Sequence, residues 1–176
     1  SFNEVEIIRY EFDGEKKISE TIILAEVLRY SNIDTGYDLA LLKTKTKSCK
    51  NGIEFASSEP KIGTEVYFVG SPMGPSGYNS YIRGIVSAHG RGVKGMQFTN
   101  SNPFLCLDQY SLPVMGGASG GPIFDFKTHK VHGLVVRVSQ VQATIAFAVP
   151  TSVIRKFAKE TDCEWAVDNK IPVPKE

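Results

Sequence analysis

Ser119 is the serine whose surroundings best suit chemistry, because it lies in the glycine-rich run of residues 115–122, Met-Gly-Gly-Ala-Ser-Gly-Gly-Pro. A serine hydroxyl becomes a useful nucleophile when a base takes its proton and backbone N–H groups stabilise the resulting oxyanion. Gly117 can adopt backbone angles that a residue with a Cβ resists, so its N–H and that of Ser119 can point at one oxygen. Pro122 ends the run, and residues 123–126 read as a strand. The pattern therefore indicates a loop held at both ends, and it favours a catalytic loop over a solvated glycine linker.

Residues 117–121 also satisfy a second serine-hydrolase pattern, the Gly-x-Ser-x-Gly nucleophile elbow. That elbow requires a strand, a sharp turn and then a helix, with the acid and the histidine after the serine. Here Pro122 follows three residues after the serine, and the next residues have strand character. The pattern therefore favours the other chain order, with histidine and acid before the serine, which is that of double-barrel proteases.

Asp38 is the acid that fits this order. It stands at the head of the apolar run of residues 37–43, which predicts a buried strand. A carboxylate in such a place costs free energy unless it is hydrogen-bonded or paired, so we expect it to have a partner. Asp34, four residues earlier, lies among turn-forming residues and is expected to be a turn residue. A cap at the start of the strand is the alternative role for Asp38, and the catalytic role is favoured.

Taken with the rest of the chain, these residues closely resemble trypsin-like serine proteases, nearest to the HtrA/Deg group. Each matching segment alone is weak, whereas their order and spacing together are specific. The segments that carry the resemblance are residues 38–43, 63–72, 84–88, 117–122 and 147–150. No PDZ domain is recognised after them.

The resemblance implies an all-β fold of two antiparallel six-stranded β-barrels, the first incomplete at its N-terminus in this chain, with a C-terminal helix. It implies a serine endopeptidase acting through a Ser-His-Asp triad and an acyl-enzyme. Ser119 would be the nucleophile, Asp38 would orient the base, and the Gly117 and Ser119 N–H groups would form the oxyanion hole.

The coarse pattern divides the chain into three parts. Residues 1–60 are expected to form the remainder of the first barrel, residues 61–149 the second barrel, and residues 150–176 the helix and tail. Residues 51–60 are expected to close the first barrel. The predicted strands are residues 5–12, 20–30, 39–43, 66–70, 80–88, 97–99, 104–108, 123–126, 131–139 and 143–149, and the predicted helix is residues 150–160.

The general base is the part that the sequence does not supply. No histidine precedes Asp38, and His89, His129 and His132 are poor substitutes. His89 is expected in a loop, His129 in a polar turn, and His132 on a strand after the nucleophile. We expect the histidine shortly before Ser1; without one, the chain would be a catalytically inactive module that binds extended peptides or partner proteins.

Regulation and specificity are also implied by the resemblance. Ala118 cannot make the ion pair by which digestive relatives are activated, so activation by insertion of a new N-terminus is not expected. The segment expected to line the pocket for the side chain before the cut bond holds no acid, which predicts a preference for apolar side chains over Lys or Arg. Its members are Pro113, Val114, Met115 and Gly116. A substrate strand is expected to pair with Val136, Arg137 and Val138, for which an ordinary core strand is the alternative.

Composition restricts the remaining possibilities. The 176 residues, 41% hydrophobic and 22% charged with a net charge of +1, fit one globular unit and argue against a nucleic-acid surface. No stretch has the length of a membrane span, and no cofactor or metal is expected. Cys49, Cys106 and Cys163 are widely spaced and odd in number, so at most one disulfide can form. The expected partner is a polypeptide substrate, with a homo-oligomer possible.

Overall fold

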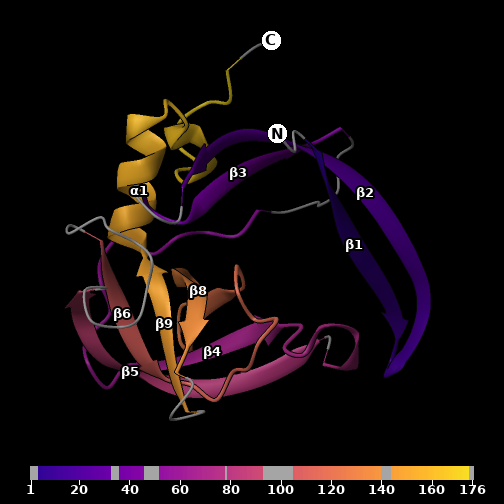
Figure 1. Cartoon of the computed structure of the whole chain (residues 1–176), viewed down its shortest axis with the longest axis horizontal. Helices are drawn as coiled ribbons and strands as arrows, with labels where there is room; N and C mark the ends of the chain where they lie inside the picture. The colour runs from indigo at the N-terminus through magenta and orange to yellow at the C-terminus, as the bar shows by residue number, and fades with distance from the viewer. Residues whose placement is uncertain are drawn as a thin grey trace.

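The computed structural model describes residues 4–32, 36–45, 52–77, 79–92, 105–139 and 144–174. Strands dominate it, in one open sheet and one closed barrel, with a helix near the C-terminus (Figure 1). The predicted all-β architecture is therefore confirmed. The predicted strand at residues 97–99 lies outside the described residues, as do Asp34 and Cys49.

The first sheet holds three antiparallel strands in the order β1-β2-β3. They are β1 (Glu4–Asp13), β2 (Lys16–Ser31) and β3 (Leu39–Thr44). Gly14, with φ at 58°, makes the tight turn between β1 and β2. Strands were predicted at all three places, and β2 extends beyond its predicted ends.

The expectation that β3 is a buried strand is wrong. Its residues alternate between half-buried and exposed, and Leu42 is 38% exposed. The reason is topological, because β3 pairs only with β2 and lies at the edge of the described sheet. Leu39 packs with Ile154 and Phe55, which buries one side of the strand only.

The second barrel is closed and contains six antiparallel strands in the order β4-β5-β6-β9-β8-β7. Its strands are β4 (Glu65–Gly70), β5 (Ser80–Gly92), β6 (Cys106–Ser111), β7 (Pro122–Asp125), β8 (Val131–Val138) and β9 (Ile145–Pro150). The short 3₁₀ turn η1 (Gly74–Ser76) connects β4 to β5. β6 begins later than predicted, and Cys106 is half-buried, while Leu105 and Leu107 face the core.

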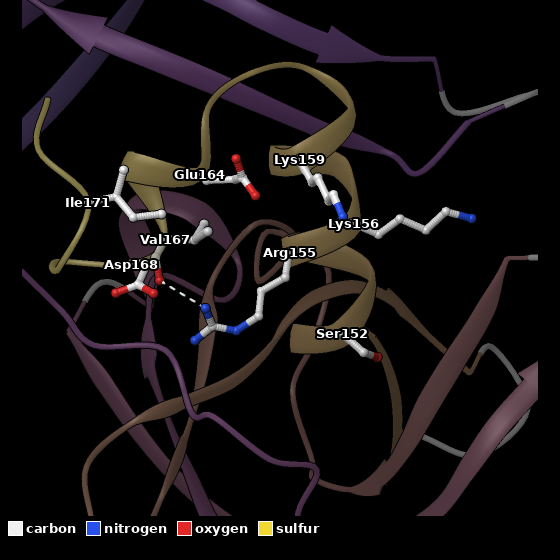
Figure 2. A pocket seen from close by; sticks show the side chains of 8 residues that line it. All are labelled: Ser152, Arg155, Lys156, Lys159, Glu164, Val167, Asp168 and Ile171. Atoms are coloured by element: carbon white, nitrogen blue, oxygen red, sulfur yellow. Dashed lines mark hydrogen bonds between the residues drawn. The ribbon is translucent and has the colours of Figure 1, made fainter. Parts of the chain in front are cut away.

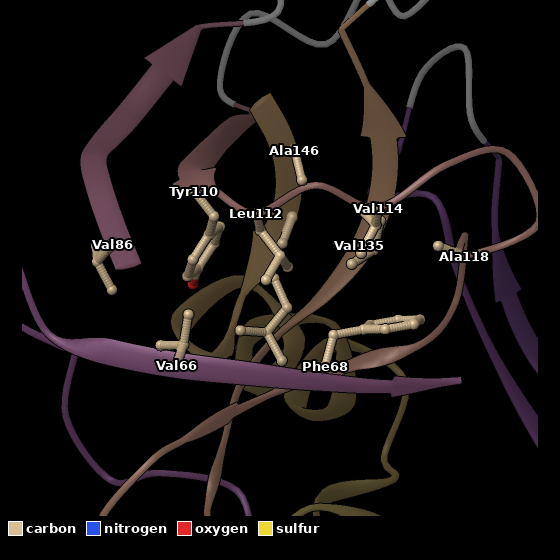
Figure 3. Close-up of a cluster of buried hydrophobic side chains, with 11 residues drawn as sticks. Val66, Phe68, Val86, Tyr110, Leu112, Val114, Ala118, Val135 and Ala146 are labelled. Carbon is tan, nitrogen blue, oxygen red and sulfur yellow. The ribbon is translucent and has the colours of Figure 1, made fainter. Parts of the chain in front are cut away.

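The interior of this barrel is a dense apolar cluster that reaches the loop carrying Ser119 (Figure 3). Val66 and Phe68 of β4 and Tyr110 of β6 are completely buried. Alternate residues of each strand point inward, which is the period-2 pattern of a half-buried sheet. Ala118 is 1% exposed and belongs to the same cluster, so core packing anchors the residue beside Ser119.

The C-terminal helix α1 (Thr151–Glu160) packs over one end of the barrel beside β3 (Figure 1). Ile154, Phe157 and Ala158 are its buried apolar residues, as the sequence pattern predicts. Thr151 Oγ1 donates to the carbonyl oxygens of Val131 (3.1 Å) and His132 (2.7 Å), which ties the helix start to β8. A short 3₁₀ turn, η2 (Glu164–Ala166), follows. In the described part of the chain, no helix is both long and apolar enough to cross a bilayer.

The linker, residues 52–60, runs from the first sheet to the second barrel. The expectation that it closes the first barrel is wrong: Phe55 forms a parallel bridge with Val131 of β8. The Ala56 N–H donates to the Val131 carbonyl, and the Val131 N–H donates to the Glu54 carbonyl, both at 2.8 Å. The linker therefore pairs with the first residue of β8 in the second barrel.

Candidate active site

The loop that carries Ser119 is held by backbone hydrogen bonds on both sides of the serine. The Gly120 N–H donates to the Val135 carbonyl (2.6 Å), and the Gly121 N–H donates to the Ala118 carbonyl (3.0 Å). Ala118 is buried and Ser119 is exposed. The loop therefore presents its hydroxyl to solvent from a rigid base, as residues 115–122 predict.

Two backbone N–H groups beside this hydroxyl are unused. Among the described residues, neither the Gly117 nor the Ser119 N–H donates a hydrogen bond. The Gly116 carbonyl accepts from the Met73 N–H at 2.6 Å. Because the peptide is trans, the Gly117 N–H points away from that carbonyl and from Met73. This orientation leaves the N–H available to an oxygen placed near Ser119.

Gly117 is a position where a side chain is not tolerated. Its φ is 93°, and an added Cβ would lie 3.0 Å from Met73 N, Gly74 N and Ser71 O. Sequence reasoning identified Gly117 but missed the segment from Ser71 to Gly74. That segment acts through its backbone, so its side chains carry no signal of this contact.

We expect Gly117→Ala to lower turnover by about 10²- to 10³-fold, the cost of losing one oxyanion-hole donor. The added Cβ must displace the backbone of residues 71–74, and the shift turns the Gly117 N–H out of position. The measurement is kcat on a peptide substrate, together with the melting temperature. Gly63→Ala is the matched control, because Gly63 also has a positive φ (86°) but meets nothing within 4 Å. A loss of turnover equal in both variants would contradict the role of Gly117.

Asp38 precedes β3 directly and has φ at 56°, in the left-handed region that aspartate tolerates better than most residues. Its side chain is half-buried. Burial raises the pKa of Asp38, and the nearby positive charge of Arg137 partly lowers it again. The carboxylate thus lies close to β8, where Arg137 is located.

Ser119 approaches the same part of β8. Its Oγ donates to the Val136 carbonyl at 3.4 Å, one residue before Arg137. Ser119 therefore contacts Val136, while the charge of the next residue of β8, Arg137, acts on Asp38, 81 positions before Ser119 in sequence. Within the described residues, no hydrogen bond joins Ser119 to Asp38. A triad would need a third group in contact with both.

In the described part of the chain, no recorded contact joins any of the three histidines to Ser119 or Asp38, and each one has other partners. His89 lies on β5, so its predicted loop position is wrong; its Nδ1 is 3.0 Å from Asp108 Oδ1. β5 continues through irregular pairing with β6 as far as Gly92, which carries His89 into the sheet. His129 occupies a turn at φ 58° and its Nδ1 lies 3.0 Å from the Tyr67 hydroxyl. His132 is on β8 as predicted, with Nε2 3.2 Å from Asp125 Oδ2.

The Asp125 carboxylate organises the turn between β7 and β8. It accepts from the N–H groups of Lys127 (2.9 Å) and Thr128 (2.7 Å) and contacts His132. Burial alone would raise the pKa of Asp125, but the Thr128 and His132 hydrogen bonds lower it to about 2. These contacts assign Asp125 and His132 a structural role.

We expect the free energy of unfolding to depend on pH through Asp125. A carboxyl with a pKa of about 2 in the folded state and about 3.9 when unfolded contributes stability that is complete above pH ~4. That contribution disappears as pH falls towards 2, and amounts to about 2 kcal/mol in total. Denaturant unfolding of the wild type and Asp125→Asn across this range provides the measurement. A stability difference that stays constant with pH would contradict the prediction.

The residues predicted to contact the substrate differ in how exposed they are to solvent. Pro113, Met115 and Gly116 are exposed, whereas Val114 is 1% exposed in the barrel core and offers a substrate almost no surface. Val136, Arg137 and Val138 are half-buried. In the described sheet the β7–β8 pairing ends at Leu134, and Val135 bonds to Gly120 and Gly121 of the serine loop. From Val136 to Val138, β8 is paired with β9 on one side.

A pocket of about 360 Å³ lies elsewhere, between α1 and η2 (Figure 2). Arg155 crosses it and donates to the Val167 (3.4 Å) and Ala56 (3.3 Å) carbonyls. Ser152, at its edge, donates to Glu59 Oε1 at 3.1 Å. The Arg155 guanidinium is therefore engaged by backbone carbonyls. Across the described ranges, no cluster of three or more His, Cys, Asp or Glu side chains could hold a metal ion.

Comparison with protein families and curated proteins agrees with this geometry. The family model described as "Trypsin-like peptidase domain" matches residues 3–134. Serine protease HTRA1 of Xenopus laevis is 33% identical over 133 residues, covering 74% of this chain and 27% of that protein. A probable periplasmic DegP-like serine endoprotease of Ectopseudomonas mendocina is 30% identical over 141 residues, covering 76% of this chain and 27% of that protein. The chain thus spans about a quarter of the length of these curated relatives.

Solved structures show the same fold at lower identity. The Rv3671c protease from M. tuberculosis in its active form superposes with a TM-score of 0.64 and 20% identity, covering 80% of this chain and 60% of that one. A serine endoprotease from Yersinia pestis has a TM-score of 0.63 and 23% identity, covering 80% of this chain and 45% of that one.

Proposed function

The chain belongs to the trypsin-like peptidase family, with relatives of the HtrA type, and on that premise we propose that it acts as a serine endopeptidase through Ser119. The observation that carries the proposal is a pair of N–H groups, on Gly117 and Ser119, that donate to no other described residue and lie beside an exposed hydroxyl on a rigid loop. Such a pair stabilises the charge that develops on a carbonyl oxygen during acyl transfer.

In the proposed reaction, the Ser119 hydroxyl attacks the peptide carbonyl while a histidine takes its proton. The Gly117 and Ser119 N–H groups bind the oxyanion. The histidine then returns the proton to the leaving amine, which yields an acyl-enzyme that water hydrolyses in the same way. Asp38 holds the histidine in the required tautomer. We propose that this histidine is not His89, His129 or His132 and lies outside residues 1–176.

The proposed substrate is an extended polypeptide that pairs with Val136, Arg137 and Val138. Support comes from residues 136–138 of β8, which are paired with β9 on one side and run beside Ser119. The exposed Met115 and the lack of an acid in residues 112–116 support a preference for apolar, small to medium side chains before the cut bond. Cleavage of a peptide library mainly after Lys or Arg would contradict that preference.

A fluorophosphonate probe tests the proposal, because it reacts only with an activated serine. The comparison uses residues 1–176 and the same chain extended by its natural upstream sequence. We expect the extended protein to be labelled, labelling to be lost in Ser119→Ala, and labelling to be kept in Ser58→Ala, which changes an exposed linker serine. Labelling of residues 1–176 alone would overturn the assignment of an outside base.

A second candidate function is a protease-fold module that binds extended peptides without cutting them. It is favoured by one observation, that each histidine of this sequence has partners other than Ser119 and Asp38. Failure of the extended protein to react with the probe, combined with peptide binding that Ser119→Ala retains, would favour this module over the enzyme.

A further inference from the structure

His89 lies between two groups that only accept hydrogen bonds. Its Nδ1 is 3.0 Å from Asp108 Oδ1, and its Nε2 is 2.8 Å from the Pro60 carbonyl oxygen. The first contact is a close charge pair rather than a well-aligned hydrogen bond. A neutral imidazole carries a single N–H, so it can satisfy only one of these oxygens. Both contacts are favourable only when His89 and Asp108 together carry one proton more than a neutral imidazole and an ionised carboxylate would carry.

The surroundings make that proton costly to lose. Asp108, on β6, is 2% exposed, and its Oδ2 is buried without a partner in the described part of the chain. The Gly90 N–H donates to this carboxylate. The Tyr110 hydroxyl is also buried, with no partner among the described residues. Without the proton, either the buried carboxylate or the Pro60 carbonyl oxygen would face the lone pair of an imidazole nitrogen.

The third partner, Pro60, gives the pair a mechanical consequence. Pro60 is the last residue of the linker between the first sheet and the second barrel. Upstream, Ala56 is bonded to Val131 of β8, and Glu59 accepts from Ser152 at the start of α1. His89 attaches the Pro60 carbonyl itself to β5 and β6, and three residues later the Gly63 N–H donates to the Val86 carbonyl of β5 at 2.8 Å.

We propose that His89 and Asp108 form a proton-operated latch, which holds the Pro60 end of the linker on the second barrel and releases it when their shared proton is lost. The latch is independent of the proposed peptidase activity, since neither residue contacts Ser119 or Asp38 among the recorded contacts. A neutral His89 would bond either Asp108 or Pro60, and the other contact would become repulsive.

The direction of the pH response follows from the groups around His89. Burial by itself lowers the pKa of His89, but the close Asp108 carboxylate, the Pro60 carbonyl and Glu59 together raise it above its ordinary 6.5. Burial likewise raises the pKa of Asp108, and the two groups titrate as one unit. On β5, Arg91 is directed to Gln109 (3.1 Å). A raised folded-state pKa means that the latch is closed below pH 6.5 and opens as the pH rises through the higher value.

An NMR titration of the three histidine rings, from about pH 5 to about pH 9, tests the latch. We expect His89 to titrate above 6.5 and Asp108→Asn to lower that pKa, because the substitution removes the negative charge beside the ring. We also expect protection of the Ala56 amide from exchange to fall as His89 deprotonates. His129→Asn is the matched control, since asparagine tolerates its left-handed backbone, and it should leave the His89 titration unchanged.

A His89 titration at or below 6.5, or one that Asp108→Asn does not shift, would overturn the latch. Should Asp108→Asn fail to fold, His89→Gln replaces it. A glutamine can donate to Pro60 but cannot titrate, so the melting temperature of the wild type should exceed that of His89→Gln most at low pH. We expect this difference in melting temperature to shrink as pH rises, and a difference that stays constant with pH would contradict the proposal.

Discussion

Replacing Ser119 with alanine should lower kcat on a peptide substrate by about a million-fold, which is the typical effect of removing the nucleophile of such a triad. The residual rate over water would come from binding and from the N–H groups of Gly117 and Ser119, which the substitution leaves in place. KM should change little, because the hydroxyl contributes to the transition state rather than to substrate binding.

The same substitution should leave stability almost unchanged. The only recorded contact of the Ser119 Oγ is the 3.4 Å bond to the Val136 carbonyl, at an exposed position. Kinetics and thermal unfolding of Ser119→Ala, measured beside Ser58→Ala, separate the two effects. If Ser119→Ala kept more than a few per cent of the wild-type kcat, another nucleophile would have to be found.

Asp38→Asn should lower kcat by about 10⁴-fold, since an amide cannot hold the histidine base in the tautomer that attack requires. Asparagine is the informative replacement here because Asp38 has φ at 56°, and asparagine tolerates that conformation. Alanine at the same position would add backbone strain and confuse a catalytic loss with a structural one.

The melting temperature of Asp38→Asn provides a second measurement, which should not fall when kcat falls. Burial raises the pKa of Asp38, so at neutral pH its charge costs free energy in the folded state, only partly offset by Arg137. Asp38→Asn removes that cost and should keep or raise the melting temperature while activity falls. Asp162→Asn, at another aspartate with φ at 55°, should alter neither quantity much. A lower melting temperature with unchanged kcat would assign Asp38 to strand capping instead.

Secondary structure was largely predictable because it follows from local periodicity. Nine of the predicted strands overlap β1 to β9 in the described residues, β6 by three positions only, and the predicted helix matches α1 to within one residue. The ends were less predictable where pairing partners decide them. β5 runs to Gly92 because β6 continues to pair with it, and that continuation placed His89 on a strand instead of in a loop.

Burial was harder to predict than strand position. The run of residues 39–43 looks like a core strand by composition, yet in the described sheet β3 is an edge strand with exposed alternate residues. Composition tells how apolar a segment is, whereas the number of neighbouring strands decides how much of it is covered. The linker shows the same limit, since its pairing with Val131 joins residues that lie far apart in sequence.

The sequence by itself determined the nucleophile candidate, because Ser119 sits among glycines between an apolar segment and a strand, and the order of acid before serine favoured a double barrel. Tertiary structure alone decided which distant groups meet. It placed Asp38 beside Arg137, the Met73 N–H on the Gly116 carbonyl, and His89 between Asp108 and Pro60. The physical reason is that local patterns act within a few residues through backbone preference and alternation, whereas these contacts arise from barrel closure, which brings together groups that no local pattern connects.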